Sequence, residues 1–166
     1  GIEQEGVARW QAMLEKIPPY QINEDGALSE WMHPDFKDNY KHRHESHLYP
    51  LFPGIEITAE TDAVLFEACR VAVEKRMTVG LGDQSGWSFT HMANVQARLG
   101  QGDRALEALE LMSRTCLGQN FLAYHNDWRR QGMTVNWLFS AKGAAYQADA
   151  NYGWTAAVLE MLAYSR

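Results

Sequence analysis

The sequence predicts an almost wholly α-helical chain. Five segments repeat apolar residues at the three-to-four-residue spacing of a helix face. Two of them are joined only by Gly100, Gln101 and Gly102, a link short enough to predict an antiparallel helical hairpin. β structure is expected only as a small hairpin over residues 20–27, where Asp25-Gly26 is a turn signal. With 166 residues and 46% hydrophobic composition, the chain can form one domain with a real core.

The first helix is expected over residues 3–16, and Pro18-Pro19 ends it. Its apolar stripe consists of Val7, Trp10, Met13, Leu14 and Ile17. The second helix is expected over residues 59–78, with Thr58 as its N-cap. Its stripe consists of Val64, Leu65, Ala68, Val71 and Ala72.

The third helix is expected over residues 87–99 and ends at Gly100. Asp103 then caps a fourth helix over residues 104–116, which ends at Gly118.

A fifth helix is expected over residues 154–164. Two long irregular stretches, 18–54 and 118–153, separate the helices. Long loops in a compact domain are usually functional or disordered, and the aromatic residues in both stretches argue against disorder.

Composition excludes some classes of function. The net charge of −6 disfavours nucleic acid as a partner, because phosphate binding needs a basic surface. No apolar run approaches the ~18 residues of a membrane span. Cys69 and Cys116 lie in apolar helical patterns and are interpreted as small buried residues. Nothing in the sequence implies a cofactor, and the localisation stays open.

The segment 42–47 is the first candidate for chemistry. His42, His44 and His47 have an H-x-H-x-x-H spacing that could bind zinc, although no cysteine lies near them. The segment could equally be a surface loop. A third interpretation is a polar site in which imidazoles and the Arg43 guanidinium bind sugar hydroxyls.

The second candidate precedes the fifth helix. If the stretch is extended, Asp149 and Asn151 point to the same side. They could simply form a capping loop. Alternatively, Asp149 is a carboxylate that the amides of Gln147 and Asn151 keep ionised and aimed. A third segment, 124–130, combines His, Asp, Trp and two Arg, and suits sugar contacts and a salt-bridged surface turn equally well.

Four segments together resemble glycoside hydrolase family 95, the family typified by α-L-fucosidases. One family pattern is H-R-H-x-S-H-L-Y/F-x-L/Y-x-P-G, matched here by residues 42–54. Another is F-Q-I-D-x-N-F-G-x-T-A, matched by residues 146–156 with Ala148 and Trp154 as departures, and followed by Glu-Met-Leu at 160–162. Between them, 86–88 resembles G-W-S and 97–105 resembles A-R-L-G-D-G-D-R-A.

The resemblance implies an (α/α)6 barrel, a ring of paired helices around one pocket. Twelve helices of ~12 residues with loops of ~5 need roughly 200 residues. The chain, residues 1–166, is therefore expected to form the C-terminal portion of such a catalytic domain, an incomplete barrel with long irregular loops.

The chemistry that the resemblance implies is inverting hydrolysis of α-L-fucosides or related α-L-galactosides, with an oligosaccharide ending in one of these sugars as the partner. A glutamate is the acid, and an asparagine backed by an aspartate activates water. The aspartate maps onto Asp149. His44 and His47 are assigned to substrate hydroxyls, with Gln147 and Asn151 beside them. No metal is implied.

The acid and the paired asparagines belong to family segments that this sequence lacks. The chain alone is therefore expected to be nearly inactive, and it could act as a non-catalytic carbohydrate-binding or structural domain. The open half-ring is also expected to favour self-association.

Overall fold

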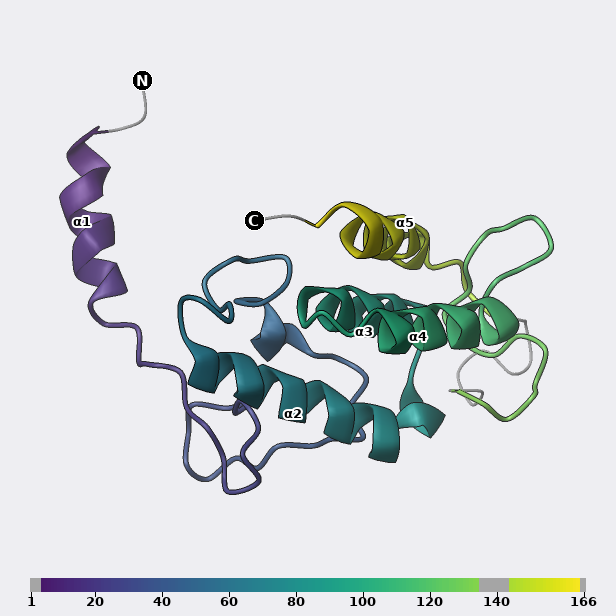
Figure 1. Cartoon of the computed structure of the whole chain (residues 1–166), viewed down its shortest axis with the longest axis horizontal. Helices are drawn as coiled ribbons and strands as arrows, with labels where there is room; N and C mark the ends of the chain where they lie inside the picture. Colours follow the sequence, from purple (N-terminus) through teal and green to yellow (C-terminus); the bar gives the residue numbers. More distant parts are fainter. Residues whose placement is uncertain (1–3, 135–143, 165–166) are drawn as a thin grey trace.

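The structure is a computed structural model that describes residues 4–134 and 144–164 (Figure 1). Within these ranges the chain has five α-helices, two short 3-10 helices and no β-strand. The predicted all-α fold is confirmed, and the described helices leave the ring open, as expected of an incomplete barrel. Their bounds are α1 Gln4–Leu14, η1 Ser46–Leu48, α2 Ala63–Val79, η2 Leu81–Asp83, α3 Gly86–Arg98, α4 Gly102–Thr115 and α5 Ala148–Ala163.

Helix α3 is the centre of the fold. Every residue from Ser88 to Ala97 is buried, and the helix packs along both α4 and α5 (Figure 1). Gly100 follows it with φ 74°, a left-handed conformation that glycine adopts without strain. The chain therefore reverses directly into α4, and the predicted hairpin is observed.

A glycine and an asparagine bring α3 and α5 into close contact. A Cβ atom at Gly153 would lie 2.5 Å from Oγ1 of Thr90, so no larger residue fits there without a shift. The buried side chain of Asn94 donates from Nδ2 to the carbonyls of Thr90 (2.7 Å) and Gly153 (2.9 Å). These bonds fix α5, which carries Asp149, against α3.

Ion pairs anchor the long loops on the helices. Arg98 at the end of α3 pairs with Glu160 of α5 and donates to the carbonyl of Gly54 at 3.2 Å. On α2, the buried guanidinium of Arg76 lies 3.1 Å from a carboxylate oxygen of Glu30. The stretch before α2 is therefore held in place although it contains no α-helix after α1.

Helix α2 begins later than the sequence predicted. Asp62 is its N-cap, and Oδ1 of Asp62 accepts hydrogen bonds from two backbone amides of the first turn at 3.0 and 2.9 Å. Thr58, the expected cap, instead accepts from the amide of Thr61 at 3.0 Å in a turn before the helix. Threonine and aspartate are both favoured as N-caps, so residue type alone cannot predict which of the two begins the helix.

Two other helix starts also differ from prediction. Helix α4 begins at Gly102 with Gln101 as N-cap, so Asp103 lies in its first turn and does not cap it. Helix α5 begins at Ala148, well before the predicted 154–164. The predicted start leaves Gly153 outside the helix, whereas in the structure it is a packing residue within α5.

The expected hairpin over residues 20–27 is reduced to one antiparallel bridge between Ile22 and Leu28. Gly26, with φ 80°, makes the turn. Oδ1 of Asn23 accepts from the amides of Asp25 and Ala27, both at 3.0 Å, so a side chain supplies bonds that a strand ladder would otherwise make.

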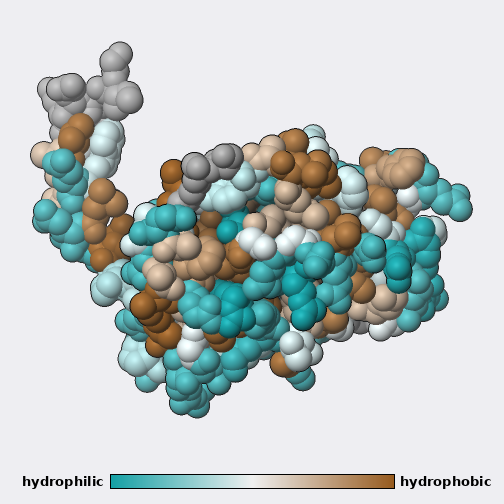
Figure 2. All heavy atoms as spheres, viewed as in Figure 1, coloured by the Kyte–Doolittle hydropathy of each residue, from teal (hydrophilic) through white to brown (hydrophobic). Residues whose placement is uncertain are grey.

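Helix α1 extends away from the other helices (Figure 1). Its expected apolar stripe is exposed, with exposed fractions between 38% and 64% for the five residues Val7, Trp10, Met13, Leu14 and Ile17. Figure 2 shows hydrophobic residues along α1 and over the α5 side of the body. None of the described helices is long and apolar enough to cross a membrane.

Candidate active site

Two segments far apart in the sequence meet at the start of α3. An antiparallel bridge joins Tyr124 to Tyr146, and His125 donates its backbone N–H to Ala145 at 2.8 Å. The carbonyl of His125 in turn accepts from Gly86, the first residue of α3, at 3.1 Å. The N-terminal ends of α3 and α5 therefore lie on either side of this bridge.

Glycine is required where the bridge approaches α3. A Cβ atom at Gly86 would lie 2.6 Å from the backbone oxygen of Tyr124. Oε1 of Gln147 accepts from the backbone N–H of Trp87 at 2.8 Å and so satisfies a free amide at the start of α3. Gln147 thus has a structural contact that the sequence did not predict, and its expected contact with substrate stays a prediction.

Asn151 has a similar structural contact. Its Oδ1 accepts from the amide of Ala123, and its Nδ2 donates to the carbonyl of Phe121, both at 2.8 Å. Phe121 has φ 61°, and these two bonds hold its turn. Both ends of the Asn151 amide are therefore engaged by the backbone, and its assignment to substrate is likewise untested.

Asp149 lies in the first turn of α5 and is exposed. A helix N-terminus favours negative charge, so the ionised carboxylate suits this position. Because residues 148–151 are helical, Asp149 and Asn151 are about 200° apart around the axis. The expectation that they share one side of an extended stretch is wrong.

Two histidines lie within electrostatic reach of Asp149. Burial lowers the pKa of His44, the charges of Arg43 and His42 lower it further, and Asp149 opposes the shift. Burial likewise lowers the pKa of His125, with contributions from Arg43 and His44, and Asp149 again opposes.

Arg43 and Asp149 both lie close enough to His44 and His125 to influence the pKa of each histidine. We name these four residues the Asp149 cluster. Since both imidazoles favour the neutral form at neutral pH, each can donate one hydrogen bond and accept another. A carboxylate, neutral imidazoles and a guanidinium together suit a neutral polyhydroxylated ligand.

A pocket of about 230 Å³ lies beside the cluster. Trp87 and His91 stack within it at an interplanar angle of 12°, with ring centroids 5.4 Å apart. Its lining consists of His44, Glu45, Ser46, Tyr49, Phe52, Pro53, Trp87 and His91. Aromatic faces next to a few polar groups are typical of small-ligand sites.

Glu45 is an unusual part of this lining. Its side chain is fully buried, and neither carboxylate oxygen has a hydrogen-bond partner among the described residues. Burial raises the pKa of Glu45 to about 8, although Arg76 opposes the shift. Nδ1 of His91 is 3.9 Å away, and burial lowers the pKa of His91 to about 4. Glu45 is therefore protonated at neutral pH, and His91 is neutral.

His47 is placed differently from His44. Both of its ring nitrogens are buried and lack a hydrogen-bond partner in the described part of the chain. Burial lowers the pKa of His47 to about 3, with Arg76 and His91 adding to the effect. His44 lines the pocket, whereas His47 is buried and does not line it, and the predicted contact of His47 with a substrate hydroxyl is untested.

The three histidines of segment 42–47 do not converge. Nδ1 of His42 lies 3.4 Å from a carboxylate oxygen of Glu30, and His47 is enclosed. Over residues 4–134 and 144–164, no three His, Cys, Asp or Glu side chains are grouped as a metal site requires.

The sequence did not assign a role to His125, Glu45 or His91. His125 belongs to the 124–130 segment, whose sequence favoured sugar contacts and a surface turn equally; only the bridge to Tyr146 links it to Asp149. His91 lies one helical turn after Trp87, and that spacing was the available signal.

Comparison with known proteins identifies the family. The family model of the glycosyl hydrolase family 95 catalytic domain matches residues 1–162. The chain is 36% identical over 151 residues to alpha-L-fucosidase 2 of Arabidopsis thaliana, covering 90% of this chain and 16% of that protein. It is 30% identical over 144 residues to probable alpha-fucosidase A of Aspergillus oryzae, covering 82% of this chain and 18% of that protein. The chain thus spans less than a fifth of these relatives, and within that span it belongs to the glycosyl hydrolase family 95 catalytic domain.

Proposed function

We propose that this chain supplies the water-activating side of an inverting glycosidase site for α-L-fucosides or related α-L-galactosides. The observation that carries the proposal is the Asp149 cluster, which combines one exposed carboxylate with neutral imidazoles beside an aromatic pocket. The two relatives are both named as fucosidases, which supports fucosides as the class of substrate.

The residues divide the work as follows. Asp149 positions the asparagine side chain that aligns the attacking water, an asparagine that belongs to a family segment this sequence lacks. Asp149 itself lies in the first turn of a helix, where negative charge is favourable. His44, which lines the pocket, binds a hydroxyl of the sugar, and His47 is assigned to a second hydroxyl although both of its ring nitrogens are buried. Gln147 and Asn151 contribute mainly by fixing the backbone on either side of Asp149.

Inversion also needs a general acid on the opposite face of the sugar. The family's acid lies in a segment that this sequence lacks, so the acid must come from outside residues 1–166. The chain alone should therefore bind a sugar and show almost no turnover.

The test is steady-state hydrolysis of 4-nitrophenyl α-L-fucoside and α-L-galactoside by the enzyme that contains this chain with the rest of its catalytic domain. Asp149→Asn should lower kcat by about 10²- to 10⁴-fold with little change in KM, because the lost role is felt in the transition state. His44→Ala, in contrast, should weaken substrate binding and so raise KM.

Asp103→Asn is the matched control. Asp103 is also an exposed aspartate in the first turn of a helix, so its loss removes the same favourable contact with the helix N-terminus. It should leave kcat unchanged. A near-normal kcat for Asp149→Asn would leave Asp149 as a helix-start residue and refute the proposal.

A non-catalytic sugar-binding domain is the second candidate. The aromatic pocket and the neutral histidines would serve it equally well. Sugar binding that survives Asp149→Asn, with no turnover by the complete enzyme, would favour this alternative.

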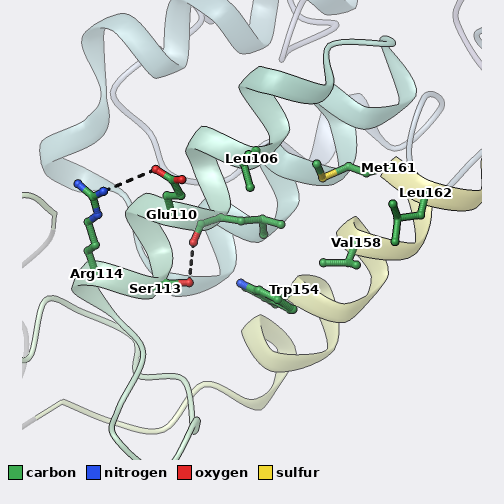
Figure 3. Close-up of a pocket in the computed structure, with 9 residues that line it drawn as sticks. Leu106, Glu110, Ser113, Arg114, Trp154, Val158, Met161 and Leu162 are labelled. Carbon is green, nitrogen blue, oxygen red and sulfur yellow. Dashed lines mark hydrogen bonds and ion pairs between the residues drawn. The ribbon is translucent and has the colours of Figure 1, made fainter.

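We also propose that the chain alone self-associates. A groove of about 410 Å³ runs between α4 and α5, where Trp154, Val158 and Met161 of α5 lie opposite Leu106 of α4 (Figure 3), and Leu109 also lines it. The stripe of α1 is another exposed apolar surface of the described chain. A helix stripe on one copy and a groove on another are complementary, so α1 of a second copy is the proposed occupant.

Sedimentation velocity tests this association. Trp10→Glu places a charge within the stripe and should shift the chain towards monomer, whereas Ala8→Glu adds the same charge to another exposed position of α1 and should not. A wild-type chain that stays monomeric at high micromolar concentration would refute the proposal.

A further inference from the structure

A second pocket lies away from the Asp149 cluster, in the stretch before α2. Its volume is about 360 Å³. Six of its lining residues matter here: Asn23, Asp25, Trp31, Phe36, Asp38 and Tyr40. Catalysis as proposed above uses none of them.

Hydrogen bonds give this pocket a defined shape. Asn23 donates from Nδ2 to a carboxylate oxygen of Asp38 and to the hydroxyl of Tyr40, the latter at 2.8 Å. The hydroxyl of Tyr40 donates to Asp25 at 2.9 Å. The other oxygen of Asp38 accepts the backbone N–H of Glu30 at 2.8 Å, which closes the loop that carries the aromatic residues.

Two aromatic rings are displayed on this closed loop. Trp31 and Phe36 meet edge to face, with centroids 5.4 Å apart and an interplanar angle of 60°. Trp31 is 47% exposed and Phe36 is 60% exposed. Burying these rings would be favourable, yet the loop holds both at the mouth of a pocket, which suits a ligand with an apolar face.

The rest of the lining is rich in acceptors. Lys75 and Tyr40 both hydrogen-bond to Asp25 and hold its pKa below the ordinary value, so its carboxylate is ionised. Each carboxylate oxygen can accept more than one hydrogen bond, which leaves capacity at Asp25 and Asp38 for a ligand's hydroxyl groups.

A pyranose ring matches both features. Its C–H face is apolar and can stack on an indole, while its hydroxyl groups at the ring edge donate to carboxylates. The carboxylates of Glu24, Asp25 and Asp38 outnumber the ammonium group of Lys37 in the lining, so a neutral sugar fits better than a uronic or sialic acid.

The pocket is connected to the catalytic segment through Glu30. The carboxylate of Glu30 lies 3.4 Å from Nδ1 of His42 and 3.1 Å from the buried guanidinium of Arg76. His42 begins the segment that contains Arg43 and His44, and its ring centroid is 5.1 Å from that of His44.

We propose that the pocket at Trp31 and Phe36 is a second saccharide-binding site that takes a neutral hexopyranose ring. The ring could belong to the same oligosaccharide, beyond its terminal sugar, or to a separate glycan. The proposal does not depend on the role of Asp149.

The experiment follows the indole N–H signals of the ¹⁵N-labelled 166-residue chain by NMR. Trp31→Ala assigns the Trp31 signal by removing it. Methyl α-L-fucoside, lactose and 2′-fucosyllactose are titrated separately. Lactose should shift the Trp31 signal saturably, and Phe36→Ala should weaken this binding by about 3- to 10-fold, as expected for loss of one aromatic contact. Trp10→Ala, which removes an exposed indole on α1, should leave it unchanged.

The two sources of the ring give different results. If one oligosaccharide spans both sites, 2′-fucosyllactose should bind more tightly than lactose, and His44→Ala should abolish the difference. If the glycan is separate, the two affinities should be equal and independent of His44. A Trp31 signal that no saccharide shifts saturably, or a lactose affinity unchanged in Phe36→Ala with the fold intact, would overturn the proposal.

Discussion

The buried carboxyl of Glu45 should make the stability of this chain fall as pH rises from about 4.5 to about 8. Burial raises the pKa of Glu45 from 4.5 to about 8. The folded state therefore holds a proton that the unfolded state releases. This stabilising contribution is fully present below about pH 4.5 and is lost as pH rises through about 8.

The magnitude follows from the two pKa values. A tenfold difference in proton affinity corresponds to about 1.4 kcal/mol, so a pKa raised from 4.5 to about 8 amounts to a loss on the order of 5 kcal/mol between acidic and alkaline pH. That is comparable to the whole stability of many small domains, so the change should be readily measurable.

Glu45→Gln removes the titrating group and keeps the shape of the side chain. Urea unfolding followed by tryptophan fluorescence should give a stability difference, wild type minus Glu45→Gln, that falls by about 1.4 kcal/mol per pH unit as pH rises towards about 8 and is constant above it. Contributions of the buried histidines are common to both proteins and cancel in the difference.

Glu107→Gln is the control, because this exposed glutamate pairs only with Arg104 on the surface of α4. Its pH profile should match that of the wild type. Parallel profiles for wild type and Glu45→Gln would refute the reasoning and mean that water or a nearby donor reaches the carboxylate.

Three other perturbations have clear expected outcomes. Gly153→Ala should destabilise the fold by about 1 to 3 kcal/mol, measured as a lower urea midpoint, because the new Cβ lies 2.5 Å from Thr90 Oγ1. Arg98→Ala should lower the free energy of unfolding by about 3 kcal/mol, because it leaves the mostly buried carboxylate of Glu160 without its partner. A loss below about 0.5 kcal/mol would show that this ion pair contributes no more than an exposed one. Burial lowers the pKa of His47 to about 3, so its contribution to stability is present above about pH 6.5 and lost as pH falls through about 3. His47→Gln should therefore reduce the acid-induced loss of stability, and an unchanged acid transition by circular dichroism would contradict this.

The sequence predicted the helices better than their starting points. Apolar spacing located all five described α-helices, because burial of a helix face imposes that spacing. The starts of α2 and α5 were wrong for different reasons. Thr58 and Asp62 are both competent caps, and only the tertiary position of the turn selects Asp62. Gly153 is a helix breaker by propensity, but close packing on α3 requires it.

The candidate site was only partly accessible from sequence. Asp149 and His44 could be named because their segments resemble family patterns. His125 could not, since its proximity to Asp149 depends on the bridge between Tyr124 and Tyr146. The complete burial of Glu45 could not be predicted either, because a glutamate in a polar segment is normally expected to be solvent-exposed.

The bridge between Tyr124 and Tyr146 has an evolutionary consequence. It closes the base of the stretch between His125 and Ala145, and the backbone there is also bonded to α3 through Gly86. The entropic cost of a longer loop grows only slowly once its ends are held together. Insertions and deletions within that stretch can therefore accumulate at little cost to Asp149. Related enzymes could thus differ in the length of that stretch while the carboxylate keeps its position.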